Sequence, residues 1–168
     1  PRSTLFPYTT LFRSERDVAP ACALANHYIE HTAVHFGYTP ETEEQFRRTW
    51  VEGRARYPWV AAEVDGAFAG YAKCGVWRTR EAYALSAETG IYVARHVQGK
   101  GVGRALYQEL IRRAREAGFH LLVAGATLPN EASVKLHESV GFERVGVFSE
   151  CGRKFDRWHD VIFWQLRL

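Results

Sequence analysis

Residues 92–110, YVARHVQGKGVGRALYQEL, join an apolar stretch to a helical one through Gly99, Gly101 and Gly103. The first N–H groups of a helix are unpaired and carry a partial positive charge, so they favour anions. Glycine has no Cβ and lets the backbone approach a ligand closely. The stretch therefore predicts a pyrophosphate-binding turn, and the alternative is an ordinary flexible turn that leads into a helix.

The glycine spacing differs from the two common nucleotide-binding motifs. The dinucleotide motif GxGxxG needs a glycine where Arg104 stands, and the phosphate loop GxxxxGK[ST] is absent. What remains is Gln98-x-x-Gly101-x-Gly103, after a predicted strand and before an amphipathic helix.

Apolar periodicity predicts alternating strands and helices on both sides of this turn. The segment 39–56 is expected to form a helix with Thr39 as its N-cap and Pro40 as its first residue. Asp65-Gly66 is a two-residue hairpin turn between strands 59–64 and 67–77. The other predicted helices are 17–30, 102–117 and 131–140, and the other predicted strands are 87–95, 119–126, 142–149 and 159–168. This order indicates an α+β (mixed α/β) fold with helices on the faces of a sheet.

The composition indicates a globular protein that binds an anionic small molecule. The chain has 168 residues, which is the length of one domain, with 46% hydrophobic and 24% charged residues. The net charge is +3, and the arginines are spread along the chain rather than gathered as in a nucleic-acid binder. No apolar run approaches the roughly 18 residues of a membrane-spanning helix.

The three cysteines, Cys22, Cys74 and Cys151, are widely separated and form no CxxC pair. We expect a reducing, cytoplasmic location and no metal site. Residues 1–14, which start with Pro and repeat TLF, are expected to be a non-native, artificially added segment, so that residues 15–168 form a single domain.

Several stretches resemble the GNAT N-acetyltransferases. QGKGVG after IYVAR is similar to the acetyl-CoA loop of that superfamily, and NEASVKLHESVGF is similar to its second signature. More narrowly, NHYIEHTAVHF, RYPWVAAEVDG, LPNEASVKLHESVGF and WHDVIFWQL resemble the phosphinothricin and methionine sulfoximine acetyltransferases, in order over residues 17–168.

The resemblance implies a GNAT-like fold, with a central mixed, mostly antiparallel, twisted sheet and helices on both faces. It also implies that the amine of a glutamate-like amino acid attacks the thioester of acetyl-CoA directly, without an acyl-enzyme. The residues that it assigns to the cosubstrate are Tyr92, Val93, Gln98, Gly99, Lys100, Gly101, Val102, Gly103, Arg104, Asn130 and Ser133. Among them, Val93 is expected to offer its backbone N–H as the oxyanion donor, and Asn130 suits a helix N-cap whatever the function.

Two residues are candidates for the chemistry. Glu88 matches the family's glutamate in the strand before the cofactor loop, and partial burial would raise its pKa toward that of a working base. The alternative is a solvated strand glutamate. His137 stands where many family members have a tyrosine that protonates the CoA thiolate. It would either donate a proton or hold the reactants in line, and the alternative is a half-buried structural histidine.

The acceptor amino acid is expected to contact WRTREAY. Arg78 and Arg80 are two residues apart, so an extended segment would point both guanidinium groups the same way, toward anionic oxygens. A solvated basic face is the alternative. The resemblance adds Tyr83, Phe36 and Val161 as pocket residues. It departs from the family at Arg78, where the family pattern has lysine.

Three other functions are alternatives to this one. An acetyltransferase of another small amine would not need the two arginines, and a non-catalytic acyl-CoA sensor would not need Glu88. A nucleic-acid binder would need a basic stripe with interleaved aromatics, which is lacking. The resemblance also implies a homodimer. The aromatic carboxyl end, with Trp158, Phe163 and Trp164, fits this, although buried core aromatics would explain it as well.

Overall fold

The computed structural model describes residues 8–12 and 15–168. Its helices are α1 (Glu15–His31), α2 (Glu43–Gly53), α3 (Val102–Glu116) and α4 (Glu131–Ser139), with short 3-10 turns η1 (Glu81–Tyr83) and η2 (Arg95–Val97). Its strands are β1 (Tyr8–Leu11), β2 (Trp59–Val64), β3 (Ala67–Val76), β4 (Ser86–Val93), β5 (Leu121–Thr127), β6 (Glu143–Lys154) and β7 (Arg157–Arg167).

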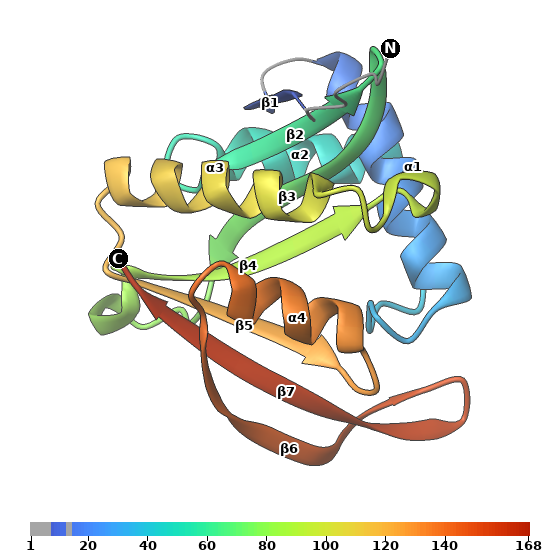
Figure 1. Ribbon diagram of the computed structural model, residues 1–168, viewed down its shortest axis with the longest axis vertical. Coiled ribbons are helices and arrows are strands. Elements are labelled where there is room, and N and C mark those ends of the chain that lie inside the picture. The colour runs from blue at the N-terminus through green and yellow to red at the C-terminus, as the bar shows by residue number, and fades with distance from the viewer. Residues whose placement is uncertain (1–7, 13–14) are drawn as a thin grey trace.

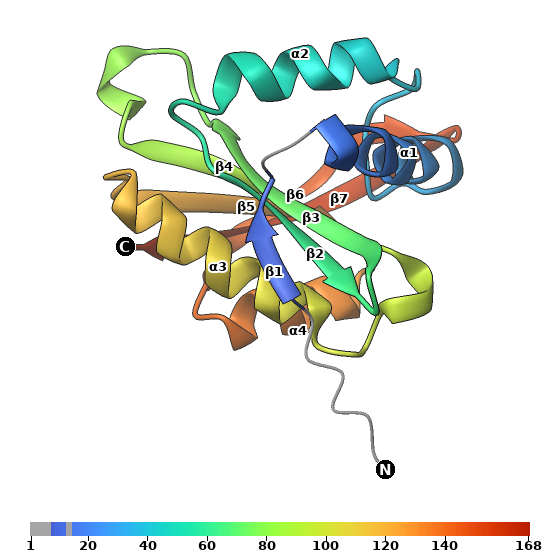
Figure 2. The ribbon, with the colours of Figure 1, turned by 90° about the horizontal axis from the view of Figure 1, so that it is seen from above.

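The strands form one sheet in the order β1-β2-β3-β4-β5-β7-β6. The β4–β5 pair is parallel, and the other neighbouring strands described are antiparallel. Helices α3 and α4 cover one face of the twisted sheet (Figure 1), and α1 and α2 cover the other (Figure 2). This arrangement confirms the predicted mixed, mostly antiparallel sheet with helices on both faces.

Each face of the sheet has its own hydrophobic core. Helix α3 contributes Leu106 and Leu110 to the larger core, together with Trp164 of β7. Helices α1 and α2 pack on the opposite face through a smaller aromatic cluster that includes Trp50 and Tyr71. Trp164 is therefore a core residue, as the alternative account of the aromatic carboxyl end supposed.

Local turn chemistry explains most of the element boundaries. Asp65 and Gly66 have φ angles of 53° and 77° and close the β2–β3 hairpin as predicted. The prediction of Thr39 as the cap of α2 was wrong. Thr42 is the N-cap, and it forms a reciprocal capping box with Gln45, in which each side chain bonds the backbone N–H of the other residue. The Thr-x-x-Gln pattern satisfies two free N–H groups and starts the helix later.

The carboxyl-terminal hairpin is longer than its sequence pattern indicated. Strand β6 continues to Lys154 rather than ending at residue 149, because it pairs with β7 as far as the Lys154–Arg157 pair. At the other end of the sheet, β1 pairs with β2. The expectation about residues 1–14 falls partly on residues 1–7 and 13–14, which lie outside the described residues. No helix in the described part of the chain is long and apolar enough to cross a membrane.

Strands β4 and β5 separate in the middle of the sheet. Their parallel pairing joins residues 86–89 to residues 121–124 and then stops. Both strands continue beyond that point, β4 to Val93 and β5 to Thr127. The separation opens a gap through the sheet, next to the glycine-rich turn that follows β4.

Candidate active site

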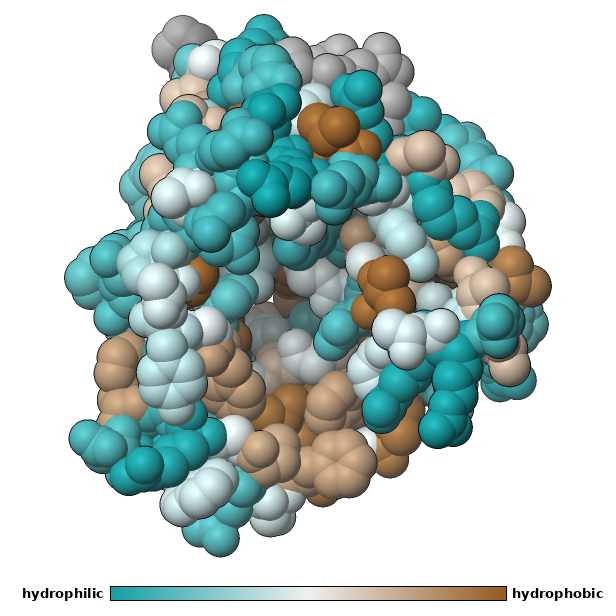
Figure 3. All heavy atoms as spheres, turned by 180° about the vertical axis from the view of Figure 1, so that it is seen from behind, coloured by the Kyte–Doolittle hydropathy of each residue, from teal (hydrophilic) through white to brown (hydrophobic). Residues whose placement is uncertain are grey.

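Two cavities meet at the gap between β4 and β5. The first has a volume of about 930 Å³ and the second about 590 Å³. Val34, Ile91, Asn130 and Ser133 line both. The face turned away from the viewer in Figure 1 is hollowed near its middle (Figure 3). Ligands bound in the two cavities would therefore come together at the gap.

The glycine-rich turn forms one wall of the first cavity. Gly99 and Gly101 have φ angles of 75° and 84°, and Gly101 is the N-cap of α3. These left-handed angles suit glycine and leave the first N–H groups of α3 without a side-chain cap. Most of the residues predicted to bind the cosubstrate line this cavity, namely Val93, Gln98, Gly99, Gly101, Gly103, Arg104, Asn130 and Ser133.

Three residues predicted for the cosubstrate lie elsewhere. The side chain of Val102 is buried in the core, and Lys100 is exposed on the turn without lining the cavity. Tyr92 lines the second cavity. The sequence motif covers every position of the strand end and the turn. The side chains of successive positions point in different directions, so they cannot all face one cavity.

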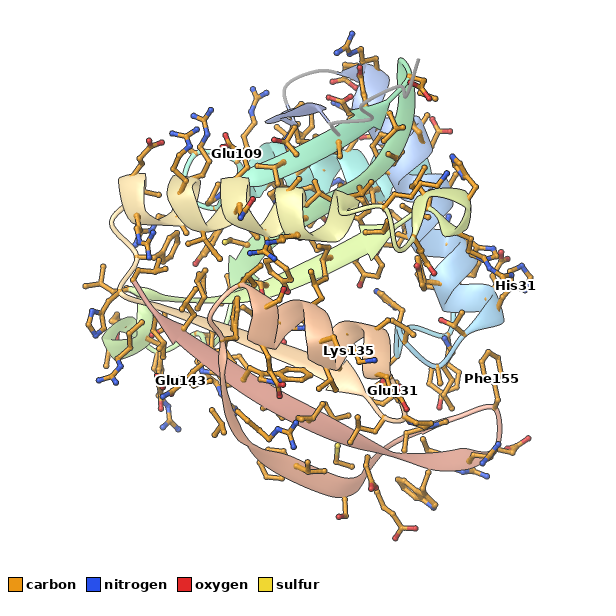
Figure 4. The ribbon with its side chains drawn as sticks, in the orientation of Figure 1. His31, Glu109, Glu131, Lys135, Glu143 and Phe155 are labelled. Carbon is orange, nitrogen blue, oxygen red and sulfur yellow. The ribbon has the colours of Figure 1, made fainter. Side chains whose placement is uncertain are left out.

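The first cavity has a basic rim that fits a phosphate-bearing ligand. Arg95 and Arg104 border it on the side of the glycine-rich turn. His31 at the end of α1 and Lys135 on α4 line it from two other elements (Figure 4). Guanidinium and ammonium groups beside free helix N–H groups are what a pyrophosphate requires.

A hydrogen-bond cluster fixes the end of β4. The Tyr28 hydroxyl donates to the Val93 carbonyl over 2.8 Å, and Gln98 Nε2 donates to the same oxygen over 3.2 Å. Ala94 N–H donates to the Ala69 carbonyl of β3 over 2.9 Å. Because the hydrogen bonds of an antiparallel pair alternate, the N–H of Val93 points away from β3 and toward the gap.

Glu88 lines the second cavity on β4. Partial burial raises the pKa of its carboxyl group, while the positive charges of Lys73 and Arg78 lower it. The net direction is upward, as predicted, although Glu88 as a whole is exposed to solvent, as the alternative reading supposed.

His137 lines the second cavity and is only 2% exposed. Its Nδ1 is 2.7 Å from the carbonyl oxygen of Ser133, which can only accept, so Nδ1 carries a proton. Burial lowers the pKa of His137, so the neutral ring leaves Nε2 as an acceptor for the Tyr107 hydroxyl, 2.6 Å away. The ring also stacks on Trp164, with 4.5 Å between ring centroids. His137 and Tyr107 therefore form a hydrogen-bonded pair, and both residues line the second cavity.

The five residues predicted for the acceptor divide into two groups. Phe36 and Val161 line the second cavity. Arg78, Arg80 and Tyr83 are exposed on the β3–β4 connection and line neither cavity in the described chain. The segment 77–80 is bent rather than extended, so the assumption behind a parallel arginine fork is not met. Arg78 still lies close enough to Glu88 to lower its pKa.

Sequence reasoning missed several residues of the second cavity. They are His35, Lys73, Gly75, Thr89, Gly90, Tyr107, Gly125, Ala126, Thr127, Cys151 and Phe163. A strand-pairing argument could have found Lys73, because it lies opposite Gly90 and close to Glu88. No group of three or more His, Cys, Asp or Glu side chains suited to a metal ion occurs among the described residues.

Comparison with known proteins yields one family. The model of the acetyltransferase (GNAT) family matches residues 23–142. A phosphinothricin N-acetyltransferase from Streptomyces viridochromogenes is 40% identical over 149 residues, which is 89% of this chain and 81% of that protein. The L-methionine sulfoximine/L-methionine sulfone acetyltransferase of Salmonella typhimurium is 38% identical over 95% of this chain and 94% of its own length.

Solved structures agree with this result. An acetyltransferase from Salmonella typhimurium, solved with its cofactor acetyl-CoA, superposes with a TM-score of 0.90 and 34% identity, covering 95% of this chain and 93% of its own. A phosphinothricin acetyltransferase from Sinorhizobium meliloti in complex with acetyl-CoA gives a TM-score of 0.91 at 29% identity, covering 96% of this chain and 88% of its own.

Proposed function

This chain belongs to the acetyltransferase (GNAT) family, and from that premise we propose that it acetylates the α-amine of a glutamate-like amino acid. Phosphinothricin, methionine sulfoximine and methionine sulfone are the acceptors that its relatives suggest. One observation carries the proposal: the glycine-rich turn and Glu88 face two cavities that meet where β4 and β5 separate.

The first cavity would hold acetyl-CoA, which supplies an acetyl group activated as a thioester. The free N–H groups at the start of α3, with Arg95, Arg104 and Lys135 at the rim, would bind its phosphates. The N–H of Val93, directed into the gap, would donate to the acetyl oxygen as negative charge builds up on it.

Glu88 would act as the base. An amino acid carries an ammonium group at neutral pH, and its nitrogen attacks only after losing a proton. The raised pKa of Glu88 suits it to take that proton directly or through water. It lines the second cavity, which in this proposal receives the acceptor.

Tyr107 and His137 would act together at the leaving group. Both residues line the second cavity, and the neutral His137 ring accepts the hydrogen bond of the Tyr107 hydroxyl. Burial raises the pKa of Tyr107 and lowers that of His137, so both are uncharged at neutral pH. His137 would thus hold the tyrosine hydroxyl in place, and the single hydroxyl proton would have to turn from Nε2 to the departing sulfur to give it a hydrogen bond.

The test is thiol release from acetyl-CoA by the purified protein. Phosphinothricin, methionine sulfoximine, methionine sulfone, glutamate and spermidine would be offered to the wild type, Glu88→Gln and the surface control Glu143→Gln. We expect release with the glutamate analogues that Glu88→Gln loses and Glu143→Gln retains. Activity only with spermidine would favour another small amine as acceptor. Acetyl-CoA binding without release for any amine would favour an acyl-CoA sensor.

A homodimer stays a prediction. Val145 and Phe148 on β6 and Trp158 on β7 are exposed, and such a hydrophobic set suits a protein contact. Gel filtration at several protein concentrations would test it.

A further inference from the structure

Two charged residues and two glycines form part of the floor of the second cavity. Lys73 on β3 lies opposite Gly90 on β4, and Gly75 lies opposite Glu88. Because side chains alternate between the faces of a sheet, all four positions face the same side, and all four line the cavity. Lys73 and Glu88 are diagonal neighbours, and such positions are roughly 7–8 Å apart.

The two glycines keep the space between these charges free of side chains. A Cβ atom added at Gly75 would meet no atom within 4 Å. One added at Gly90 would be 3.7 Å from the Tyr92 ring and 3.8 Å from the Lys73 side chain, which are ordinary contacts. A small molecule can therefore lie against the strands between Lys73 and Glu88.

Lys73 has no anionic partner in the described part of the chain. No ion pair within 4.0 Å and no hydrogen bond involves its ammonium group, which lies 4.8 Å from the centroid of the Trp59 ring. Burial lowers the pKa of Lys73, while Glu41 and Glu88 favour its charged form. A partly desolvated ammonium group that faces a cavity is stabilised by any ligand that brings a negative charge to it.

Resting on the proposed function, we propose that Lys73 binds the α-carboxylate of the acceptor, so that Lys73 and Glu88 together recognise the zwitterion of an α-amino acid. Glu88 contacts the ammonium end and Lys73 the carboxylate end. An amine without a carboxylate can contact Glu88 through its ammonium group, but it offers no anion to Lys73. The pair thus selects α-amino acids as a class, and other residues of the cavity read the side chain.

The test compares methionine sulfone with its decarboxylated analogue, 3-(methylsulfonyl)propan-1-amine. These two acceptors differ only in the α-carboxylate, and their side chains are uncharged. For Lys73→Met we expect kcat/KM for methionine sulfone to fall roughly 10- to 100-fold, mainly through KM, as for a lost hydrogen bond between charged groups. For the analogue, kcat/KM should change less than about threefold. Lys73→Arg keeps a cation that can bind a carboxylate and should restore much of the preference.

Other outcomes would overturn the assignment. Lys73→Met could lower kcat/KM for phosphinothricin, whose side chain is acidic, and leave kcat/KM for methionine sulfone unchanged. Lys73 would then bind the side-chain acid instead. An equal loss of kcat/KM for methionine sulfone and its analogue, with a shifted pH profile, would mean that Lys73 acts on Glu88.

Thermal melting and acetyl-CoA titration of each variant report folding, and Lys73→Gln replaces Lys73→Met if the latter does not fold. If the wild-type protein is inactive with every amino acid, the proposed function itself is refuted. If Lys73→Met keeps the wild-type preference for methionine sulfone over its analogue, only this assignment is refuted.

Discussion

The imidazole of His137 holds the hydroxyl group of Tyr107 at 2.6 Å, although the two residues are 30 positions apart in the chain. His137 is fixed in turn by the Ser133 carbonyl and by the stacked ring of Trp164. The histidine that the sequence motif marks is therefore held in the core, next to a tyrosine of α3 that lines the same cavity.

Tyr107→Phe tests this relationship. The substitution removes the hydroxyl and leaves His137 Nε2 without its partner, so the free energy of unfolding should fall by about 1–3 kcal/mol. In the proposed mechanism kcat should fall roughly 10- to 100-fold, at the lower end of what a proton-handling group contributes. Denaturant titration and steady-state kinetics would measure both. The double variant with His137→Phe should lose less than the sum of the single losses, because they share one hydrogen bond, and strict additivity would contradict the pairing.

The pH dependence of activity should follow Glu88. Only the ionised carboxylate can accept a proton, so activity is lost as the pH falls through a pKa that burial has raised. Arg78 lowers this pKa, and Arg78→Gln should therefore move the acid limb of kcat/KM to higher pH. Arg80→Gln is the matched control, because Arg80 is not among the charges that act on Glu88. Profiles that coincide for the wild type and Arg78→Gln would rule out Glu88 as the titrating base.

Gly152→Ala should displace an acceptor-pocket residue. A Cβ atom at this position of β6 would lie within 2.1 Å of the Phe36 ring, which must swing away from it. Because Phe36 lines the second cavity, KM for the acceptor should rise severalfold while acetyl-CoA binding is unchanged. The control Gly146→Ala, on the same strand, adds a methyl group that meets nothing within 4 Å. Equal KM values for both variants would separate Phe36 from acceptor binding.

Gly101→Ala should weaken acetyl-CoA binding. Gly101 has a φ of 84°, and an alanine in this left-handed region costs about 1–2 kcal/mol. Relief of that strain would rotate the backbone before α3 and misdirect its N–H groups. Isothermal titration should show a higher Kd for acetyl-CoA, and thermal melting a lower Tm. Gly53→Ala at the end of α2 has no positive φ, so it should neither raise the Kd nor lower the Tm. A loss of binding there that matches Gly101→Ala would point to a general effect of alanine.

The glycine-rich turn and the proposed catalytic glutamate were within reach of sequence reasoning because their signals are local. The Gln98 to Arg104 pattern marked the start of α3, and the alternation along β4 placed Glu88 on one face with Gly90. The cap of α2 was also a local signal, but Thr39-Pro40 and the Thr42 capping box both suit a helix start. The reciprocal bonds with Gln45 favour Thr42.

The arginines of the β3–β4 connection show where local reasoning fails. Two residues spaced by two share a direction only if the backbone is extended, and the backbone at 77–80 bends. Their exposure depends on how the connection leaves the sheet, which no pattern of two residues determines.

By itself, the sequence determined the type and order of the helices and strands after residue 15, the glycine-rich turn at the start of α3 and the family of the protein, because periodicity, turns and caps act over a few residues. Tertiary structure alone decided which distant residues meet. The pairing of β3 with β4 sets Lys73 beside Glu88, the packing of α3 on α4 joins Tyr107 to His137, and the early end of the β4–β5 pairing opens the gap where the cavities join. These contacts depend on strand register and on core packing across the whole chain, which a local pattern does not encode.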